Sequence, residues 1–169
     1  MATATAKHVD SEKLTAPFIE STKSVFKMML GWDVELGESL RSNAFQSMHD
    51  VSGIIGFSGK LRGTVVISID SEVAFAAAES FLGARPTDIN SDVIDMVGEL
   101  ANMVGGNAKE RMNVAGIDLG LPTVVSGKGH TICFDPGAQV EILPFTSPWG
   151  PLTVEIGIRP GQILPASGE

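Results

Sequence analysis

The sequence predicts an α/β protein of the α+β kind, in which long helices pack on one face of an antiparallel-rich sheet. Apolar residues recur at helical spacing in two long segments, 11–30 and 92–113. Short β-branched runs separated by Gly, Pro and Ser fill most of the last third of the chain. The resulting order of helix, strands, two helices and strands lacks the regular alternation of a doubly wound parallel sheet.

The first predicted helix covers residues 11–30. Pro17 is expected in its first turn, where a missing N–H costs no hydrogen bond, and Gly31 ends the helix. Two β-branched runs then flank the sequence SGKLRG, and this pattern predicts a hairpin over residues 51–70.

Two further helices follow the hairpin. Ser71 and Gly83 bound an alanine-rich stretch, and we predict that they cap a short helix. The turn sequence RPTDINS leads to the second long helix, which is predicted to be capped by Ser91 or Asp92 and to end before Gly116.

The last third of the chain is predicted to be β structure, in the runs LPTVVSG, HTICFD, AQVEILPF and GPLTVEIGIRP. Cys133 lies in the second run and is expected to be a buried apolar thiol. In the final run, apolar residues alternate with Glu155, Gly157 and Arg159, which predicts a strand with one face in water.

Length, charge and composition restrict the class of protein. The 169 residues fit a flexible segment over residues 1–10 and a single domain over 11–169. The net charge of −8 argues against a nucleic-acid partner and against binding to anionic lipid. Because no apolar run is long enough to span a bilayer and no signal peptide is recognisable, we expect a cytoplasmic protein.

The second long helix carries a narrow polar stripe. At 3.6 residues per turn its polar and small side chains share a sector about 100° wide; they are Asp95, Glu99, Asn102, Gly106, Lys109, Glu110 and Asn113. Any half-buried helix shows a polar stripe to water. Adjacent glycines, however, cost a helix about 1 kcal/mol each relative to alanine. Their position beside Glu99 and Asn102 therefore indicates a surface that another protein contacts.

The remaining candidate sites are weak. The three histidines, His8, His49 and His130, show no spacing typical of a metal site. The glycine-rich stretch GFSGKLRG lacks the Gly-Lys-Ser/Thr ending of a phosphate-binding loop, and a hairpin explains its glycines. We therefore predict neither a metal site nor a nucleotide site.

At the polar stripe the sequence resembles the CheX, CheC and FliY family of chemotaxis phosphatases. The family pattern is a Glu, two residues and an Asn on a helix, and here it reads GELANMVGGNAK. The resemblance continues through APFIESTKSVFKMMLG, VSGIIGFSGKLRGTVVISI and LGLPTVVSGKGH, in that order. It covers nearly the whole chain after the first ten or so residues and implies a CheX-like phosphatase domain.

The resemblance also implies an activity. Family members dephosphorylate the aspartyl phosphate of a response-regulator receiver domain such as CheY. Carried over to this chain, Asn102 would orient the attacking water and Glu99 would pair with a receiver lysine. The receiver would supply Mg²⁺, so this chain needs no cofactor or metal of its own. We expect four further residues to shape the partner contact, namely Asp95, Gly105, Gly106 and Lys109.

One position departs from the pattern of two-site relatives. The first helix has Glu20 but carries Lys23 where a second Asn would stand, so we expect a single active site, as in CheX-like members. The resemblance also implies a homodimer. Two alternatives remain open at this stage: a receiver-binding adaptor without activity, like a flagellar switch protein, and a small-ligand sensor.

Overall fold

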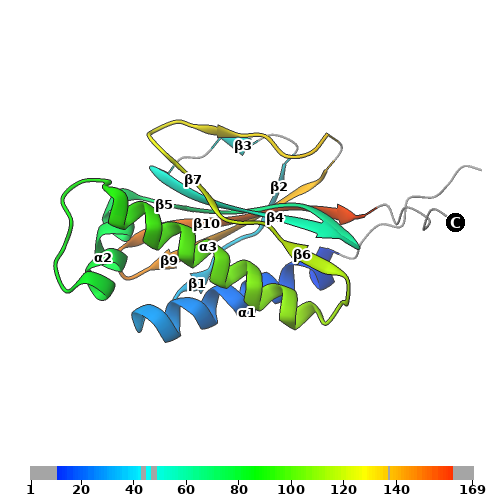
Figure 1. Cartoon of the computed structure of the whole chain (residues 1–169), viewed down its shortest axis with the longest axis horizontal. Coiled ribbons are helices and arrows are strands. Elements are labelled where there is room, and N and C mark those ends of the chain that lie inside the picture. Colours follow the sequence, from blue (N-terminus) through cyan, green and yellow to red (C-terminus); the bar gives the residue numbers. More distant parts are fainter. Residues whose placement is uncertain (1–10, 43–44, 47–48, 137, 162–169) are drawn as a thin grey trace, which may run out of the picture.

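The computed structural model describes residues 11–42, 45–46, 49–136 and 138–161. Within these ranges the chain forms three helices and ten strands (Figure 1). The helices are α1 (Ser11–Leu30), α2 (Ser71–Leu82) and α3 (Ser91–Met112). The strands are β1 (Glu35–Leu36), β2 (Leu40–Ser42), β3 (Phe45–Gln46), β4 (Val51–Gly59), β5 (Leu61–Ile69), β6 (Ile117–Leu119), β7 (Thr123–Ser126), β8 (Thr131–Ile132), β9 (Val140–Ser147) and β10 (Gly150–Pro160).

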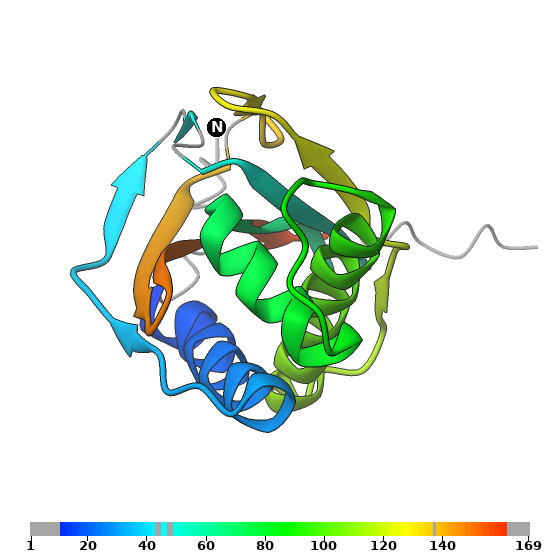
Figure 2. The same cartoon turned by 90° about the vertical axis from the view of Figure 1, so that its left-hand side faces the viewer.

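Eight of the strands form one antiparallel sheet. Its order is β1-β9-β10-β5-β4-β6, with β2 also paired to β9 and β7 also paired to β4. The remaining strands, β3 and β8, form a separate antiparallel pair. The three helices lie together on one side of the sheet, which curves around them (Figure 2). The predicted α+β architecture with helices on one face is therefore confirmed.

The core lies between this sheet and the helices. The register pairs Val51 with Ile69 and Ile55 with Val65, so that these apolar side chains share the face turned toward the helices. Gly53 lies on the same face, where an added Cβ would be 2.8 Å from the Cβ of Ala101. A side chain at this position would push α3 off the sheet, so this glycine sets how closely the helix packs.

The predicted hairpin and all three predicted helices are present, with small shifts at their starts. Pro17 lies inside α1 rather than in its first turn, because the helix begins at Ser11. Asp70, not Ser71, is the N-cap residue of α2, and the Ser71 N–H donates instead to Asp50 Oδ2 at 3.0 Å. The N-cap of α3 is Asn90, one residue before the predicted pair.

The second face of the sheet is covered, contrary to the sequence prediction for the last strand. Glu155 has no exposed surface, and Gly157 is buried. The ring of Phe134, from the segment between β8 and β9, occupies the space where a Gly157 side chain would stand, because an added Cβ would lie 2.2 Å from that ring. The prediction of a water-exposed face was wrong at these two positions, whereas Arg159 is exposed.

The prediction for the single cysteine was also wrong. Cys133 is exposed and follows β8 rather than lying within a strand. The run HTICFD forms only a two-residue strand, and its neighbour Ile132 is the side chain that is buried. In the described part of the chain, no helix is long and apolar enough to cross a membrane. The segment 1–10, predicted to be flexible, lies outside the described residues.

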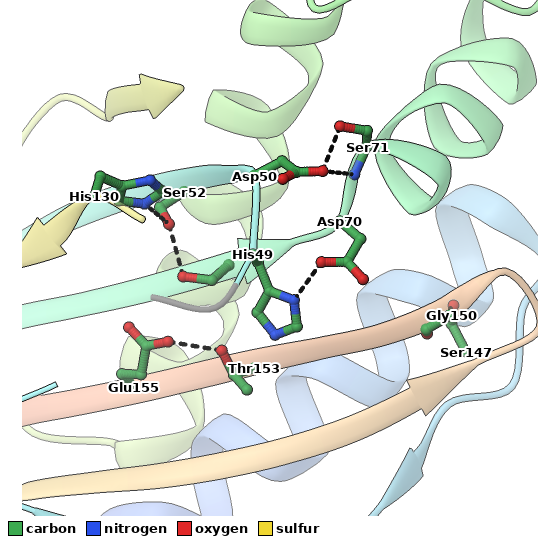
Figure 3. A network of polar contacts seen from close by, with 11 residues as sticks. His49, Asp50, Ser52, Asp70, Ser71, His130, Ser147, Gly150, Thr153 and Glu155 are labelled. Atoms are coloured by element: carbon green, nitrogen blue, oxygen red, sulfur yellow. Dashed lines mark hydrogen bonds and ion pairs between the residues drawn. The ribbon is translucent and has the colours of Figure 1, made fainter. Parts of the chain in front are cut away.

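Polar side chains form a network on this covered face (Figure 3). Ser52 Oγ lies 2.7 Å from Ser68 Oγ and 2.7 Å from His130 Nε2. On β10, the Thr153 hydroxyl donates to Glu155 Oε1 at 2.7 Å. Glu155 Oε2 has no hydrogen-bond partner among the described residues. Burial raises the pKa of Glu155 to about 7, against the opposing effect of the Thr153 hydrogen bond.

This carboxyl group makes stability depend on pH. Because the pKa of Glu155 is about 7 in the folded protein and 4.5 for an ordinary glutamate, the folded protein binds one more proton than the unfolded chain between these pH values. Stability from this group is present below pH 4.5 and is lost as the pH rises through about 7. The loss corresponds to roughly 3 kcal/mol of unfolding free energy.

Glu155→Gln should remove this dependence, because glutamine keeps the shape of the side chain without the ionisation. Urea unfolding at pH 5 and pH 8 would measure it. We compare the unfolding free energy of the variant with that of the natural protein at each pH. The difference should favour the variant more at pH 8 than at pH 5. An equal difference at the two pH values would contradict the prediction.

Candidate functional site

The candidate site lies on α3, which is anchored at both ends and along its buried side. At its start, Asn90 Oδ1 accepts a hydrogen bond from the Val93 N–H at 3.1 Å. At its end, Asn113 adopts a left-handed conformation with φ 50°, and its N–H donates to the Glu110 carbonyl. From α1, the Ser21 hydroxyl donates to the Val104 carbonyl at 2.8 Å. The helix therefore presents its outer side chains from a fixed frame.

The polar stripe predicted from the sequence is present on the outer side of this helix. We call its five candidate site residues the α3 ridge: Asp95, Glu99, Asn102, Gly106 and Lys109. Asp95 and Glu99 are exposed, and the other three are half-buried. The opposite side of the helix is buried against the sheet through Val97 and Ala101. Glu99 and Asn102 are three residues apart and so stand next to each other on the ridge.

The two central glycines have different environments. An added Cβ at Gly105 would lie 3.0 Å from Ile55 Cγ2, so this glycine allows the helix to pack on β4. Gly105 is buried. The sequence predicted that it shapes the partner contact, and we no longer include it among those residues. An added Cβ at Gly106 would meet no atom of residues 11–42, 45–46, 49–136 and 138–161 within 4 Å. Packing among the described residues therefore does not explain why position 106 is a glycine, although glycine costs a helix about 1 kcal/mol relative to alanine.

Apolar side chains border the ridge on both sides. On one side Phe81 and Leu82, at the end of α2, are 45% and 49% exposed. On the other side Pro122 lies against α3, where an added Cβ at Gly98 would be 3.8 Å from it. The preceding residue, Leu121, is 92% exposed. Exposed apolar side chains on both sides of a polar ridge are typical of a protein contact surface.

The chemistry available on the ridge is limited to positioning and charge. Asn102 offers an amide that can donate and accept hydrogen bonds, and Glu99 offers a carboxylate that can accept them. In the described part of the chain, no group of three or more His, Cys, Asp or Glu side chains could hold a metal ion. On α1, Glu20 and Lys23 are exposed and do not form a second Glu–Asn pair.

The sequence did not reveal the apolar border. Phe81 and Leu82 end an alanine-rich helix, for which the sequence predicted only the two caps. The exposure of both side chains depends on where α2 ends relative to α3, which the sequence of either helix does not determine. A signal was nevertheless available, because α2 changes from small buried residues over 76–78 to two large apolar residues immediately before Gly83.

A family model and a curated protein that resemble this chain both carry the same name, CheX. The family model described as chemotaxis phosphatase CheX matches residues 51–146. The curated protein CheY-P phosphatase CheX from Thermotoga maritima is 24% identical over 119 residues, covering 69% of this chain and 77% of that protein.

Solved structures extend the similarity to most of the chain. Chemotaxis protein CheX from Vibrio vulnificus is 36% identical, with a TM-score of 0.80, and the match covers 87% of this chain and 99% of that one. CheX in the CheX–CheY–BeF₃–Mg²⁺ complex from Borrelia burgdorferi is 26% identical, with a TM-score of 0.71 and coverage of 86% and 97%. FliY from Thermotoga maritima shares the fold at 17% identity, with a TM-score of 0.64 and coverage of 89% and 92%. The chain belongs to the CheX family.

Proposed function

We propose that this protein hydrolyses the aspartyl phosphate of a CheY-like response-regulator receiver domain in chemotaxis or a related two-component pathway. The curated relative from Thermotoga maritima is named a CheY-P phosphatase. The similar structure from Borrelia burgdorferi is a complex of CheX with CheY, BeF₃ and Mg²⁺. Beryllium fluoride commonly stands in for a phosphoryl group, so this complex is consistent with a phosphorylated receiver as the substrate.

The observation that carries the proposal is the pairing of Glu99 and Asn102 with Gly106 on the exposed side of α3. The helix runs unbroken from Ser91 to Met112 despite its two central glycines. Gly106 leaves open space one turn beyond Asn102, and no described residue of this chain packs into that space. A receiver backbone could approach the helix closely at this point.

In the proposed reaction, a water oxygen forms a bond to phosphorus in line with the aspartyl oxygen, whose bond to phosphorus breaks. Inorganic phosphate and the free receiver aspartate result. The Asn102 amide oxygen accepts a hydrogen bond from the water, and its NH₂ group donates to a phosphoryl oxygen. Because phosphoryl transfer has a loose transition state, positioning and charge neutralisation matter more than a strong base. A neutral amide supplies both contacts without adding negative charge.

Glu99 would have a different role. Its exposed carboxylate would pair with a lysine of the receiver and so orient the two proteins. In this proposal Mg²⁺ belongs to the receiver's phosphorylation site. This chain adds no cofactor, and Lys109 would contact the receiver beyond Gly106.

The experiment is to follow the decay of phosphorylated receiver domains in the presence of Mg²⁺, with and without this protein. The receivers should come from the same cell and be freed of the small phosphodonor. We expect this protein, at a concentration well below that of the receiver, to accelerate the decay of at least one of them. Unchanged decay of every receiver, together with retained binding, would reject the phosphatase in favour of the adaptor.

We also propose that the protein is a homodimer and acts in the cytoplasm, where its receiver substrate would be located. The dimer is implied by the family resemblance. Sedimentation equilibrium of the full chain would test it, with a mass of twice 17.7 kDa expected. A mass of 17.7 kDa across the micromolar range would contradict the dimer.

A further inference from the structure

A pocket of about 260 Å³ lies between the end of α2 and the start of α3, directly beside the ridge. It is lined by Phe81, Leu82, Asp92, Asp95, Met96 and Glu99. We propose that this pocket receives one apolar side chain of the receiver domain, from a segment that also carries Lys or Arg, and that this contact selects and positions the receiver. The inference rests on the proposed function and specifies its partner surface.

The apolar wall of the pocket is unusual for this chain. The face of α2 that packs in the core is made of small side chains, Ala74 and residues 76–78 among them, which are buried. Two large apolar residues at the end of the same helix, Phe81 and Leu82, are instead about half exposed, whereas Phe75 packs against the core. They are adjacent and lie within one pocket, so they form a continuous patch rather than scattered surface residues.

The size of the pocket favours a side chain over a small-molecule ligand. Ligand sites usually have volumes of about 300–1,000 Å³ and enclose most of the ligand. At about 260 Å³, this pocket is smaller than that range and is bounded by half-exposed side chains. An apolar side chain projecting from a protein surface would enter it and cover part of Phe81 and Leu82.

The rim of the pocket determines the charge of the segment that fits it. Asp92, Asp95 and Glu99 are all exposed, and the described residues that line the pocket include no basic side chain. An acidic segment would be repelled, whereas a segment with Lys or Arg beside its apolar residue would be attracted. The receiver lysine that would pair with Glu99 meets this requirement at one side of the pocket.

The pocket is continuous with the proposed reaction site. Glu99 and Asp95 belong both to the pocket lining and to the α3 ridge. Asn102 lies one helical turn from Glu99, about 5 Å along the axis. A side chain held in the pocket would therefore fix the distance between the receiver surface and the amide. Displacements of about 1 Å are enough to impair catalysis of this kind.

The test compares steady-state kinetics of the full-length natural protein and a Phe81→Ala/Leu82→Ala variant on a phosphorylated receiver that the natural protein dephosphorylates. Loss of two large side chains from an interface pocket should raise KM about ten- to hundredfold. The value of kcat at saturation should also fall, by up to about tenfold, because the receiver surface is no longer held at a fixed distance from the amide. Leu82→Gln should also raise KM. Glutamine is as good a helix former as leucine, so this variant removes the apolar contact without weakening α2.

Val114→Ala is the matched control. Val114 is an exposed apolar residue, like the pocket pair, but it follows the far end of α3. It lies 15 residues beyond Glu99, the nearest lining residue on that helix, or about 22 Å along the axis. We expect its KM to stay within about twofold of the natural value, a change of less than 0.5 kcal/mol in binding.

The charge requirement has its own test. Asp92→Asn/Asp95→Asn should weaken binding of the receiver, and the difference from the natural protein should shrink as salt is added. A receiver whose basic segment fits the rim should show this effect, because attraction between exposed charges is screened by salt. Equal affinity of the two proteins at low salt would overturn the requirement for Lys or Arg.

Direct binding of a beryllium fluoride-treated receiver separates failure of the pocket from failure of the phosphatase. Unchanged KM and affinity in the Phe81→Ala/Leu82→Ala variant would overturn the pocket and leave the phosphatase intact. Binding that depends on Phe81 and Leu82 without any hydrolysis would support the pocket and reject the phosphatase. Absence of both binding and hydrolysis with every receiver of the cell would overturn both.

Discussion

Replacing Asn102 by alanine is expected to lower the turnover of receiver phosphate about 10²- to 10³-fold. Loss of one preorganised hydrogen-bond donor at a reacting group commonly has an effect of this size. The Asn102 side chain is half-buried on the outer side of α3 and lies off the core-facing side, so the fold should persist. Single-turnover decay of the phosphorylated receiver at saturating protein would measure the effect.

Asn107→Ala provides the control for this prediction. Asn107 is also a half-buried amide on α3, but it lies outside the α3 ridge. Its removal should leave turnover within about twofold of the natural value, a difference of under 0.5 kcal/mol in the barrier. Equal activities of the Asn102→Ala and natural proteins, with equal amounts of folded protein, would reject the assigned role of the amide.

Replacing Gly106 by leucine should change stability and activity in opposite directions. In the free protein an added Cβ at this position meets no atom of the described part of the chain within 4 Å. Leucine is a much better helix former than glycine, by close to 1 kcal/mol, which corresponds to a Tm increase of about 2–4 °C for a chain of this size. The new side chain would occupy the space needed by the receiver, and we expect kcat/KM to fall on the order of a hundredfold.

The neighbouring position supplies the contrast. Gly105→Leu should lower Tm, because an added Cβ already lies 3.0 Å from Ile55 and the larger side chain would separate α3 from β4. Thermal unfolding and receiver dephosphorylation measured on both variants would distinguish a glycine retained for packing from one retained for a partner. A Gly106→Leu protein with full activity would show that the receiver does not approach this part of the helix.

Elements with strong local signals were predictable from the sequence. The helix over residues 11–30 and the hairpin of β4 and β5 follow from apolar periodicity and from a glycine-containing turn. The Glu99–Asn102 spacing is likewise local, because any α-helix places residues three apart next to each other. The ridge was therefore predictable from the sequence, whereas the function proposed for it rests on the family resemblance.

Features that depend on contacts between distant segments could not be predicted in this way. Glu155 reads as a water-facing residue because its strand alternates, but the segment containing Phe134 covers that face. Cys133 was expected to be buried, but only its neighbour Ile132 enters the interior. The pocket beside Glu99 requires the end of α2 to lie next to the start of α3. Neither helix sequence determines that arrangement.

The most direct test of the account is a crystal structure of this protein in complex with a receiver domain, beryllium fluoride and Mg²⁺. The account predicts that Asn102 lies within hydrogen-bond distance, about 3 Å, of the beryllium fluoride group or of a water facing it. Glu99 should contact a receiver lysine in the same complex. A receiver bound elsewhere on the sheet or helices, with Asn102 left in solvent, would contradict the central claim.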